Sequence, residues 1–273
     1  MNPISNTAYY CCGVRMDDAE RTPSLCHDHY ARRFMDAHGL EVFAPFRTET
    51  MPNILNITRC RIVDDLVRRE LTRERATTVV SIGAGFDTRP YRFNAGRWVE
   101  LDEPQVIDVK NARLPAEECP NPLARLSIRF ATDSLATTLA PHAGAAPTLV
   151  LIEGVFMYLE PAAIEATLRA VRQVFPRHLL VCDLMNRRFF DKFAYRMHRK
   201  IVATGASFTR RPDDPAAQFV RHDYRLTARI PMILRAVEFG VLQQRTRIPN
   251  FLARLMPRVS KDINGYAVHC FEM

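Results

Sequence analysis

The sequence lacks the long apolar segments and the cysteine patterns that mark several classes of protein. No apolar run reaches the ~18 residues that a membrane-spanning helix needs, and residues 1–6 lack the basic start and apolar core of a signal peptide. We therefore expect a cytoplasmic protein that does not bind membranes. The 7 cysteines are an odd number without paired metal-ligand spacing, so we expect reduced thiols and no bound metal.

Repeats, low-complexity tracts and Pro-rich linkers are also missing. The 18 prolines are spread over 273 residues, so we expect a single domain over residues 1–273. The net charge of +8 comes mainly from dispersed arginines, and no nucleic-acid recognition motif accompanies it, so no nucleic-acid partner is expected. Basic residues are densest at 187–200, which indicates either a solvated helix face or a landing surface for an anionic substrate or carrier.

Glycine is scarce, with 10 in the chain, but two glycines stand close together in Gly83, Ala84 and Gly85. They follow the apolar run 79–82. A buried strand that runs into a Gly-x-Gly turn is typical of a nucleotide-binding loop, because glycine permits backbone angles and close approaches that a side chain blocks.

The residues after this loop separate two classes of cofactor. The third glycine of a dinucleotide fingerprint is replaced by Thr88, and Asp87 precedes it. A carboxylate here would repel the pyrophosphate of NAD, whereas it suits the ammonium or sulfonium group of S-adenosylmethionine. A second predicted strand, 97–102, ends in Asp102, 19 residues after Gly83, where such units place the acid that binds the ribose hydroxyls.

Strands and helices are predicted to alternate, which favours an α/β fold with a doubly wound, mostly parallel sheet. Strands are expected at 78–82, 97–102, 127–131, 148–153, 178–183, 241–247 and 265–272, the last two as an antiparallel edge pair, and helices at 57–71, 161–175, 187–203 and 229–240. Ligands of such sheets bind beyond the carboxyl ends of the strands, where Gly83, Asp102, Asp133, Glu153 and Asp183 are expected.

Three segments carry a family resemblance: "SIGAGFDTRPYRF", "WVELDEPQVIDVK" and "LVLIEGVFMYL". Together they resemble the leucine carboxyl methyltransferase family over roughly residues 59–184. That family includes the enzyme that methylates the C-terminal leucine of a protein phosphatase, and bacterial O-methyltransferases of polyketide biosynthesis whose length is nearer to this chain. The resemblance implies a Rossmann-like domain with S-adenosylmethionine as cofactor and a helical lid, for which we expect segments 1–56 and 186–225.

The resemblance also implies roles at the amino-acid end of the cofactor. Arg59 matches an arginine that meets the methionine carboxylate, and Glu153 matches a glutamate near the same end. The alternatives are a pairing of Arg59 with Asp64 or Asp65 on its own helix, and a cap by Glu153 on the helix that follows it.

At the adenosine end, the resemblance assigns the glycine loop 83–85 and the ribose-binding acid Asp102. Asp133 matches an Asp-Leu pair beside the adenine, but Ser134 replaces the leucine. The alternative for Asp133 is an N-cap, since Ser134 and Leu135 follow. Arg89 and Arg92 in the loop block are expected to be structural partners of Asp87.

No residue stands out as a general base. His27, His29 and His38 fall in the expected lid and His178 and His269 in expected strands. A lone histidine is more often structural than catalytic. A carboxylate acceptor, with a pKa of about 4, needs no base, whereas a phenol at about 10 does. We therefore expect an O-methyltransferase that acts on a carboxylate of a small acidic metabolite or natural-product intermediate, free or carrier-bound, with Tyr158 as a candidate substrate contact. The alternatives are phenol or hydroxyl methylation, and a non-catalytic adenosyl-ligand-binding protein.

Overall fold

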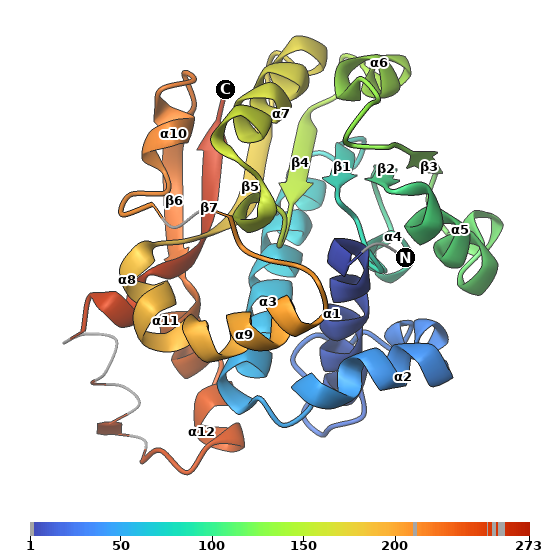
Figure 1. The fold of residues 1–273 in the computed structure, drawn as a ribbon. Coiled ribbons are helices and arrows are strands. Elements are labelled where there is room, and N and C mark those ends of the chain that lie inside the picture. The colour runs from blue at the N-terminus through green and yellow to red at the C-terminus, as the bar shows by residue number, and fades with distance from the viewer. Residues whose placement is uncertain (1–2, 210–211, 250, 253–254, 256–259) are drawn as a thin grey trace.

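A seven-stranded sheet in the order β3-β2-β1-β4-β5-β7-β6 forms the centre of the molecule (Figure 1). The computed structural model describes residues 3–209, 212–249, 251–252, 255 and 260–273. The pairs that join β3, β2, β1, β4 and β5 are parallel, and β7 runs antiparallel to both β5 and β6. The strands are β1 Thr78–Ile82, β2 Arg97–Asp102, β3 Leu123–Ser127, β4 Thr148–Ile152, β5 Leu179–Met185, β6 Arg225–Pro231 and β7 Tyr266–Glu272. The expected α/β class is confirmed.

Helices connect the strands and extend both ends of the fold. The α-helices are α1 Pro3–Ala19, α2 Ala37–Phe43, α3 Thr50–Arg73, α4 Arg89–Arg92, α5 Pro104–Arg113, α6 Leu135–Leu139, α7 Pro161–Val174, α8 Arg187–Phe189, α9 Tyr195–Ala203, α10 Ala217–Val220, α11 Met232–Glu238 and α12 Val241–Arg245. Short 3-10 turns are η1 Ala31–Phe34, η2 Ala44–Phe46, η3 Ala116–Glu118, η4 Ala140–His142, η5 Phe156–Tyr158 and η7 Asp262–Asn264, and η6 Phe190–Ala194 is a π-turn. None of the described helices is long and apolar enough to cross a membrane.

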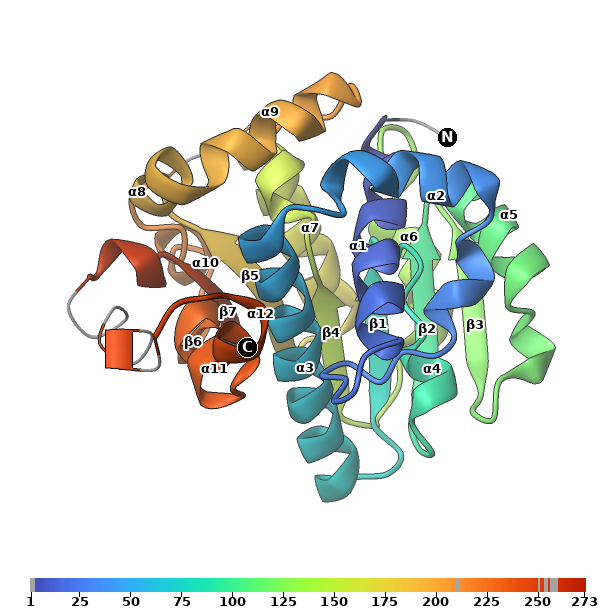
Figure 2. The ribbon, with the colours of Figure 1, turned by 90° about the horizontal axis from the view of Figure 1, so that it is seen from below.

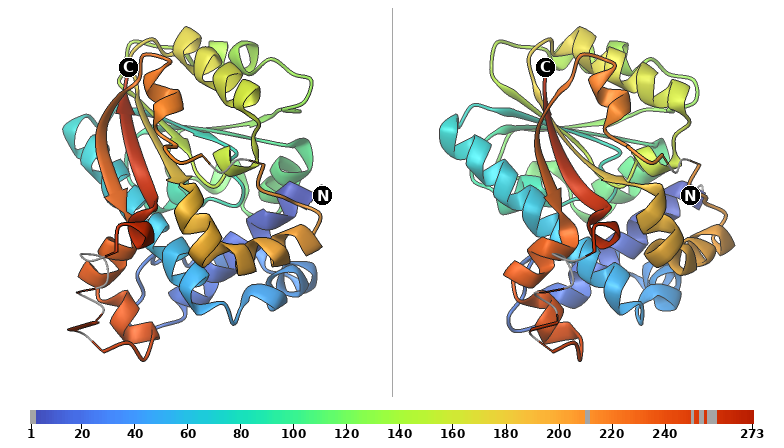
Figure 3. Two further views of the ribbon diagram at one scale, coloured as in Figure 1. Left: turned by 60° about the vertical axis from the view of Figure 1, so that its left-hand side comes forward. Right: turned by 90° about the vertical axis from the view of Figure 1, so that its left-hand side faces the viewer.

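The central strands are buried on both faces, because their alternate residues enter two separate hydrophobic cores. Val79, Leu149 and Val181 belong to the core that contains the apolar side of α3. Val80, Val150 and Leu180 belong to the core that contains the apolar side of α7. Figure 3 shows α3 and α7 on opposite sides of the sheet.

Helices from distant parts of the sequence cover the carboxyl ends of the parallel strands. Figures 1 and 2 show α1, α2, α9 and the start of α3 beside these carboxyl ends. The helices α1 and α2, the start of α3, and the helical stretch 187–203 therefore lie adjacent to the carboxyl ends of the strands, where the sequence places its candidate ligand site.

The expected strand at 127–131 is wrong, because β3 spans Leu123–Ser127. The alternating apolar residues Ile128 and Phe130 suggested a strand, but they follow it. Inside β3 the side chain of Arg125 is only 2% exposed, because its Nε lies 3.0 Å from Glu100 Oε2. Because a buried ion pair places a charged residue inside this edge strand, a search for apolar residues does not find the strand.

The expected strand at 241–247 is also wrong, because Val241–Arg245 forms the helix α12. Its place in the sheet is taken by Arg225–Pro231, which is β6 and lies partly within the expected helix 229–240. β6 is an edge strand with mostly exposed or half-buried residues, so it lacks the apolar run of an inner strand. The last two strands do pair antiparallel, but the pair joins β6 to β7, and β7 lies inside the sheet between β5 and β6.

Candidate functional site

A cavity of about 1060 Å³ opens at the carboxyl ends of the parallel strands. This volume slightly exceeds the range of about 300–1,000 Å³ for a site that holds one small molecule. The cavity can therefore receive two ligands side by side. All nine candidate residues line it, namely Arg59, Gly83, Ala84, Gly85, Asp102, Asp133, Ser134, Glu153 and Tyr158.

The glycine loop forms one wall of the cavity and needs both of its glycines. Gly83 and Gly85 have φ values of 69° and 48°, a region that other residues rarely adopt. A Cβ on Gly83 would lie 2.5 Å from Cγ2 of Val155, and a Cβ on Gly85 would lie 3.3 Å from the Cβ of Ala8. Residues other than glycine would therefore be strained at both positions, and at Gly83 the added Cβ would also collide with Val155.

Asp102 fixes this loop from the end of β2. One of its carboxylate oxygens accepts the Gly85 N–H at 2.6 Å, and the other accepts the Glu103 N–H at 2.7 Å. Burial raises the pKa of Asp102, while these two hydrogen bonds oppose the rise. A carboxylate has about four lone-pair positions, so Asp102 can still accept ligand hydroxyls. Glu103 also lines the cavity, and only its place next to Asp102 could have indicated it.

Asp133 and Ser134 lie at the rim beyond β3. Asp133 Oδ2 accepts the Arg129 N–H at 2.9 Å. Ser134, not Asp133, is the N-cap of α6, because its side chain accepts the Thr137 N–H. The N-cap alternative for Asp133 is therefore wrong. The exposed ring of Phe130 also lines this part of the cavity, because Phe130 follows β3 and does not belong to the strand expected at 127–131.

Arg59 reaches the cavity from the middle of α3. Its Nη1 lies 3.0 Å from Asp183 Oδ2, and its Nε lies 3.6 Å from Glu153 Oε2. The alternative pairing with Asp64 or Asp65 is wrong. The structure therefore joins Arg59 to Glu153 and to the buried Asp183 of the neighbouring strand. Asp183 lies inside β5 and not at its end, because the strand continues to Met185.

Glu153 follows β4 directly and is held by a second arginine. Arg89 Nη1 donates to Glu153 Oε1 at 2.5 Å and to Asp87 Oδ2 at 2.8 Å. Burial raises the pKa of Glu153, against the opposing effects of Arg89 and Arg59. Glu153 does not cap a helix, since the N-cap of α7 is residue 160. The expected partnership of Arg89 with Asp87 is confirmed, whereas Arg92 pairs with Asp64 instead.

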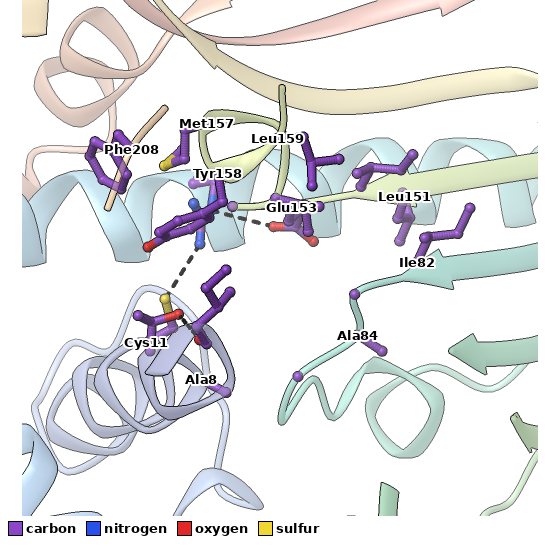
Figure 4. Close-up of a pocket in the computed structure, with 18 of the residues that line it drawn as sticks. Ala8, Cys11, Ile82, Ala84, Leu151, Glu153, Met157, Tyr158, Leu159 and Phe208 are labelled. Carbon is purple, nitrogen blue, oxygen red and sulfur yellow. Dashed lines mark hydrogen bonds and ion pairs between the residues drawn. The ribbon is translucent and has the colours of Figure 1, made fainter. Parts of the chain in front are cut away.

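The remaining walls are largely apolar and come from segments far apart in the sequence. Figure 4 shows Tyr158 beside Met157 and Phe208, with Ala8 and Cys11 of α1 below them. The rings of Tyr158 and Phe208 meet edge to face, with centroids 5.1 Å apart. Burial raises the pKa of Tyr158, so its hydroxyl stays protonated and can donate a hydrogen bond. The sequence could not place Phe208 here, because only tertiary packing brings it to the cavity.

Histidine is missing from the described lining of the cavity. The described part of the chain also contains no group of three or more His, Cys, Asp or Glu residues arranged to hold a metal ion. The described walls present carboxylates, arginines, tyrosines and apolar side chains, together with Lys192, Cys11 and several amide and hydroxyl side chains.

Comparisons with known proteins identify relatives of this chain. The family model described as leucine carboxyl methyltransferase matches residues 11–172. A predicted S-adenosyl-L-methionine-dependent methyltransferase of Streptomyces coelicolor is 27% identical over 252 residues, which cover 86% of this chain and 87% of that protein. The tetracenomycin polyketide synthesis O-methyltransferase of Streptomyces glaucescens is 25% identical over 169 residues, covering 61% of this chain and 60% of that protein.

A solved structure with the same fold is that of a predicted methyltransferase from Thermobifida fusca. Its TM-score is 0.58 at 14% identity, and the match covers 89% of this chain and 92% of that chain. At this identity the likeness shows the fold alone.

Proposed function

This chain belongs to the leucine carboxyl methyltransferase family and is an S-adenosyl-L-methionine-dependent methyltransferase, and we propose that it methylates a carboxylate of a small acidic metabolite or natural-product intermediate. The observation that carries this proposal is the described lining of the cavity, which contains no histidine, the most frequent general base. An acceptor with a pKa of about 4 is already ionised at neutral pH and needs no base. A phenol with a pKa of about 10 would need one.

The walls of the cavity fit the cofactor at both of its ends. We propose that Asp102 accepts the ribose hydroxyls, that loop 83–85 lies along the adenosine, and that Asp133 and Ser134 lie beside the adenine. Gly83 and Gly85 support this placement, because both line the cavity with a positive φ at which a larger residue would be strained. When bound, S-adenosylmethionine supplies a methyl group on a positively charged sulfur.

At the other end, we propose that Arg59 pairs with the carboxylate of the cofactor and that Glu153 receives its ammonium group. The two side chains line the same part of the cavity, with Arg59 Nε 3.6 Å from Glu153 Oε2. Opposite charges at this spacing match a group that carries both charges on one carbon. An ionised Glu153 is required for this role, because the neutral acid gives up the charge attraction.

The acceptor lies, in our proposal, between Tyr158 and the apolar wall. The protonated hydroxyl of Tyr158 donates to one acceptor oxygen and leaves the other free to attack. Side chains such as Met157, Met197 and Phe208 line the wall, which suits an acid with an apolar body. Holding acceptor and donor in line can lower the barrier by about 7–11 kcal/mol at best.

We further propose a single methyltransferase domain over residues 1–273, with lid segments 1–56 and 186–225. Both segments contribute lining residues, for example Ala8 and Cys11 from the first and Met197 and Phe208 from the second. A cover of this kind excludes water from the reacting groups. The acceptor itself is a small acid, either free or attached to a carrier.

The experiment that tests the proposal offers the enzyme matched pairs of carboxylic acids and phenols with the same apolar body. Formation of S-adenosylhomocysteine is followed from about pH 6 to about pH 9. We expect turnover of acids with a rate that changes little with pH, since the acceptor is ionised throughout. Turnover of phenols alone, rising towards their pKa of about 10, would establish the hydroxyl alternative. Cofactor binding without turnover of either class would favour the non-catalytic alternative.

A further inference from the structure

Arg89 is the centre of a buried charge cluster in the wall of the cavity, and it is itself one of the lining residues. Its side chain is 4% exposed, and its Nε lies 2.6 Å from Asp64 Oδ1. Its Nη1 lies 2.8 Å from Asp87 and 2.5 Å from Glu153. These three carboxylates come from α3, from the loop after β1 and from the residue after β4. A planar guanidinium with five N–H donors can bind all three at once, which a lysine ammonium on its flexible stem cannot do in the same geometry.

Glu153 has no other cationic partner this close among the described residues. Arg59 lies farther away, at 3.6 Å, and its Nη1 is engaged by Asp183 at 3.0 Å. Asp87 adds a like charge on the same side, since it shares Nη1 of Arg89. Glu153 therefore depends on Arg89 for its counter-charge and for its orientation.

We propose that Arg89 is a positioning residue that holds Glu153 ionised and aimed at the ammonium group of the cofactor. This inference rests on the proposed role of Glu153. In this account Arg89 does not touch the cofactor but acts through the carboxylate that does. The same guanidinium ties α3 to the glycine loop through Asp64 and Asp87, so it also fixes the two walls between which Glu153 lies.

The loss of Arg89 has a consequence for pH dependence. The charged groups that face Glu153 are Arg89 from α4, Arg59 from α3 and Asp87 from the loop after β1, with Asp183 of β5 behind Arg59. Burial already raises the pKa of Glu153, and Arg89 is the strongest opposing influence. Without this guanidinium the pKa rises further, so Glu153 becomes neutral as the pH falls and regains its charge as the pH rises.

The test measures the Kd of S-adenosylhomocysteine by calorimetry from about pH 6 to about pH 8. At each pH, the Kd of the variant is divided by the Kd of the wild type. This ratio removes the titration of the ligand's own amino group. For Arg89→Gln we expect the ratio of Kd values to be about tenfold higher at about pH 6 than at about pH 8, which corresponds to one unit of pKa. For Arg89→Lys we expect weaker binding at every pH but little change of the ratio with pH, because the positive charge is kept.

Arg92→Gln is the matched control. Arg92 lies on the same helix and pairs with the same Asp64, at 2.6 Å, but it is not among the cavity-lining residues. Arg92→Gln should lower the unfolding temperature, but its ratio of Kd values should not change with pH. A flat ratio for Arg89→Gln would overturn the inference. If that variant does not fold, wild-type affinity of Arg89→Lys at every pH would overturn it instead.

Glu153→Gln separates this inference from the proposed site. Unchanged affinity in Glu153→Gln would overturn the proposed role of Glu153 itself. Weaker binding by Glu153→Gln together with a flat ratio for Arg89→Gln would overturn only the inference about Arg89.

Discussion

Replacement of Asp102 by asparagine separates ligand binding from folding. Both carboxylate oxygens accept backbone N–H groups, at 2.6 Å from Gly85 and 2.7 Å from Glu103. Asparagine keeps one oxygen and turns an NH₂ group towards the other N–H. It also removes the negative charge that we assign to the ribose hydroxyls.

The magnitude follows from the type of bond that is lost. A hydrogen bond to a charged group contributes about 1.5–3 kcal/mol, which corresponds to about a 10- to 150-fold rise in Kd. The effect on folding should be smaller, because burial raises the pKa of Asp102. A raised pKa means that the ionised carboxylate is unfavourable in the folded protein near neutral pH, so its removal offsets part of the lost hydrogen bond.

Calorimetric titration with S-adenosylmethionine and S-adenosylhomocysteine measures this change. Both ligands carry the ribose, so Asp102→Asn should weaken both by the same factor while thermal unfolding changes little. Asp108→Asn, at an exposed position of α5, is the control and should bind both ligands as the wild type does. Unchanged affinity in a folded Asp102→Asn protein would refute the placement of the ribose.

Three further predictions concern the loop, a buried histidine and the acceptor. Gly83→Ala should destabilise the protein by at least about 1–2 kcal/mol in denaturant unfolding, because φ is 69° and the new Cβ would meet Val155 at 2.5 Å. The control Gly144→Ala should leave the stability unchanged, since nothing lies within 4 Å of its Cβ position. Burial lowers the pKa of His269 to about 4, below about 6.5 in the unfolded chain. Unfolding free energy should therefore fall by at most about 3 kcal/mol as the pH drops from about 6.5 to about 4, and His269→Gln should flatten this part of a pH series. Tyr158→Phe should raise the KM for the acceptor about 2- to 12-fold through a loss of about 0.5–1.5 kcal/mol, with unchanged affinity for S-adenosylhomocysteine in calorimetry; an unchanged KM would contradict the assigned contact.

The sequence was most informative where burial is complete. β1 and β4 are buried at every position, so their apolar runs marked them within a residue. The site residues at their ends could be placed together because parallel strands end at one edge of a sheet. Expectations were wrong at the two edge strands, β3 and β6, where an internal arginine and solvent exposure erase the apolar pattern.

Other parts of the site depend on packing that no local pattern encodes. The ion pair between Arg59 and Asp183 joins residues 124 positions apart. The contact of Phe208 with Tyr158 likewise depends on where the segment after α9 folds back. Arg89 was correctly matched to its neighbour Asp87, but its bond to Glu153 spans 64 positions and was not predicted.

The type of bond between the transferred methyl group and the acceptor tests the central claim most directly. The wild-type enzyme is incubated with methyl-labelled S-adenosylmethionine and an apolar carboxylic acid, and the labelled product is treated with alkali. A carboxylate acceptor gives a methyl ester, so we predict that the label is released as methanol. A labelled product that survives alkali would be an ether or another stable methyl compound, and it would contradict methylation of a carboxylate.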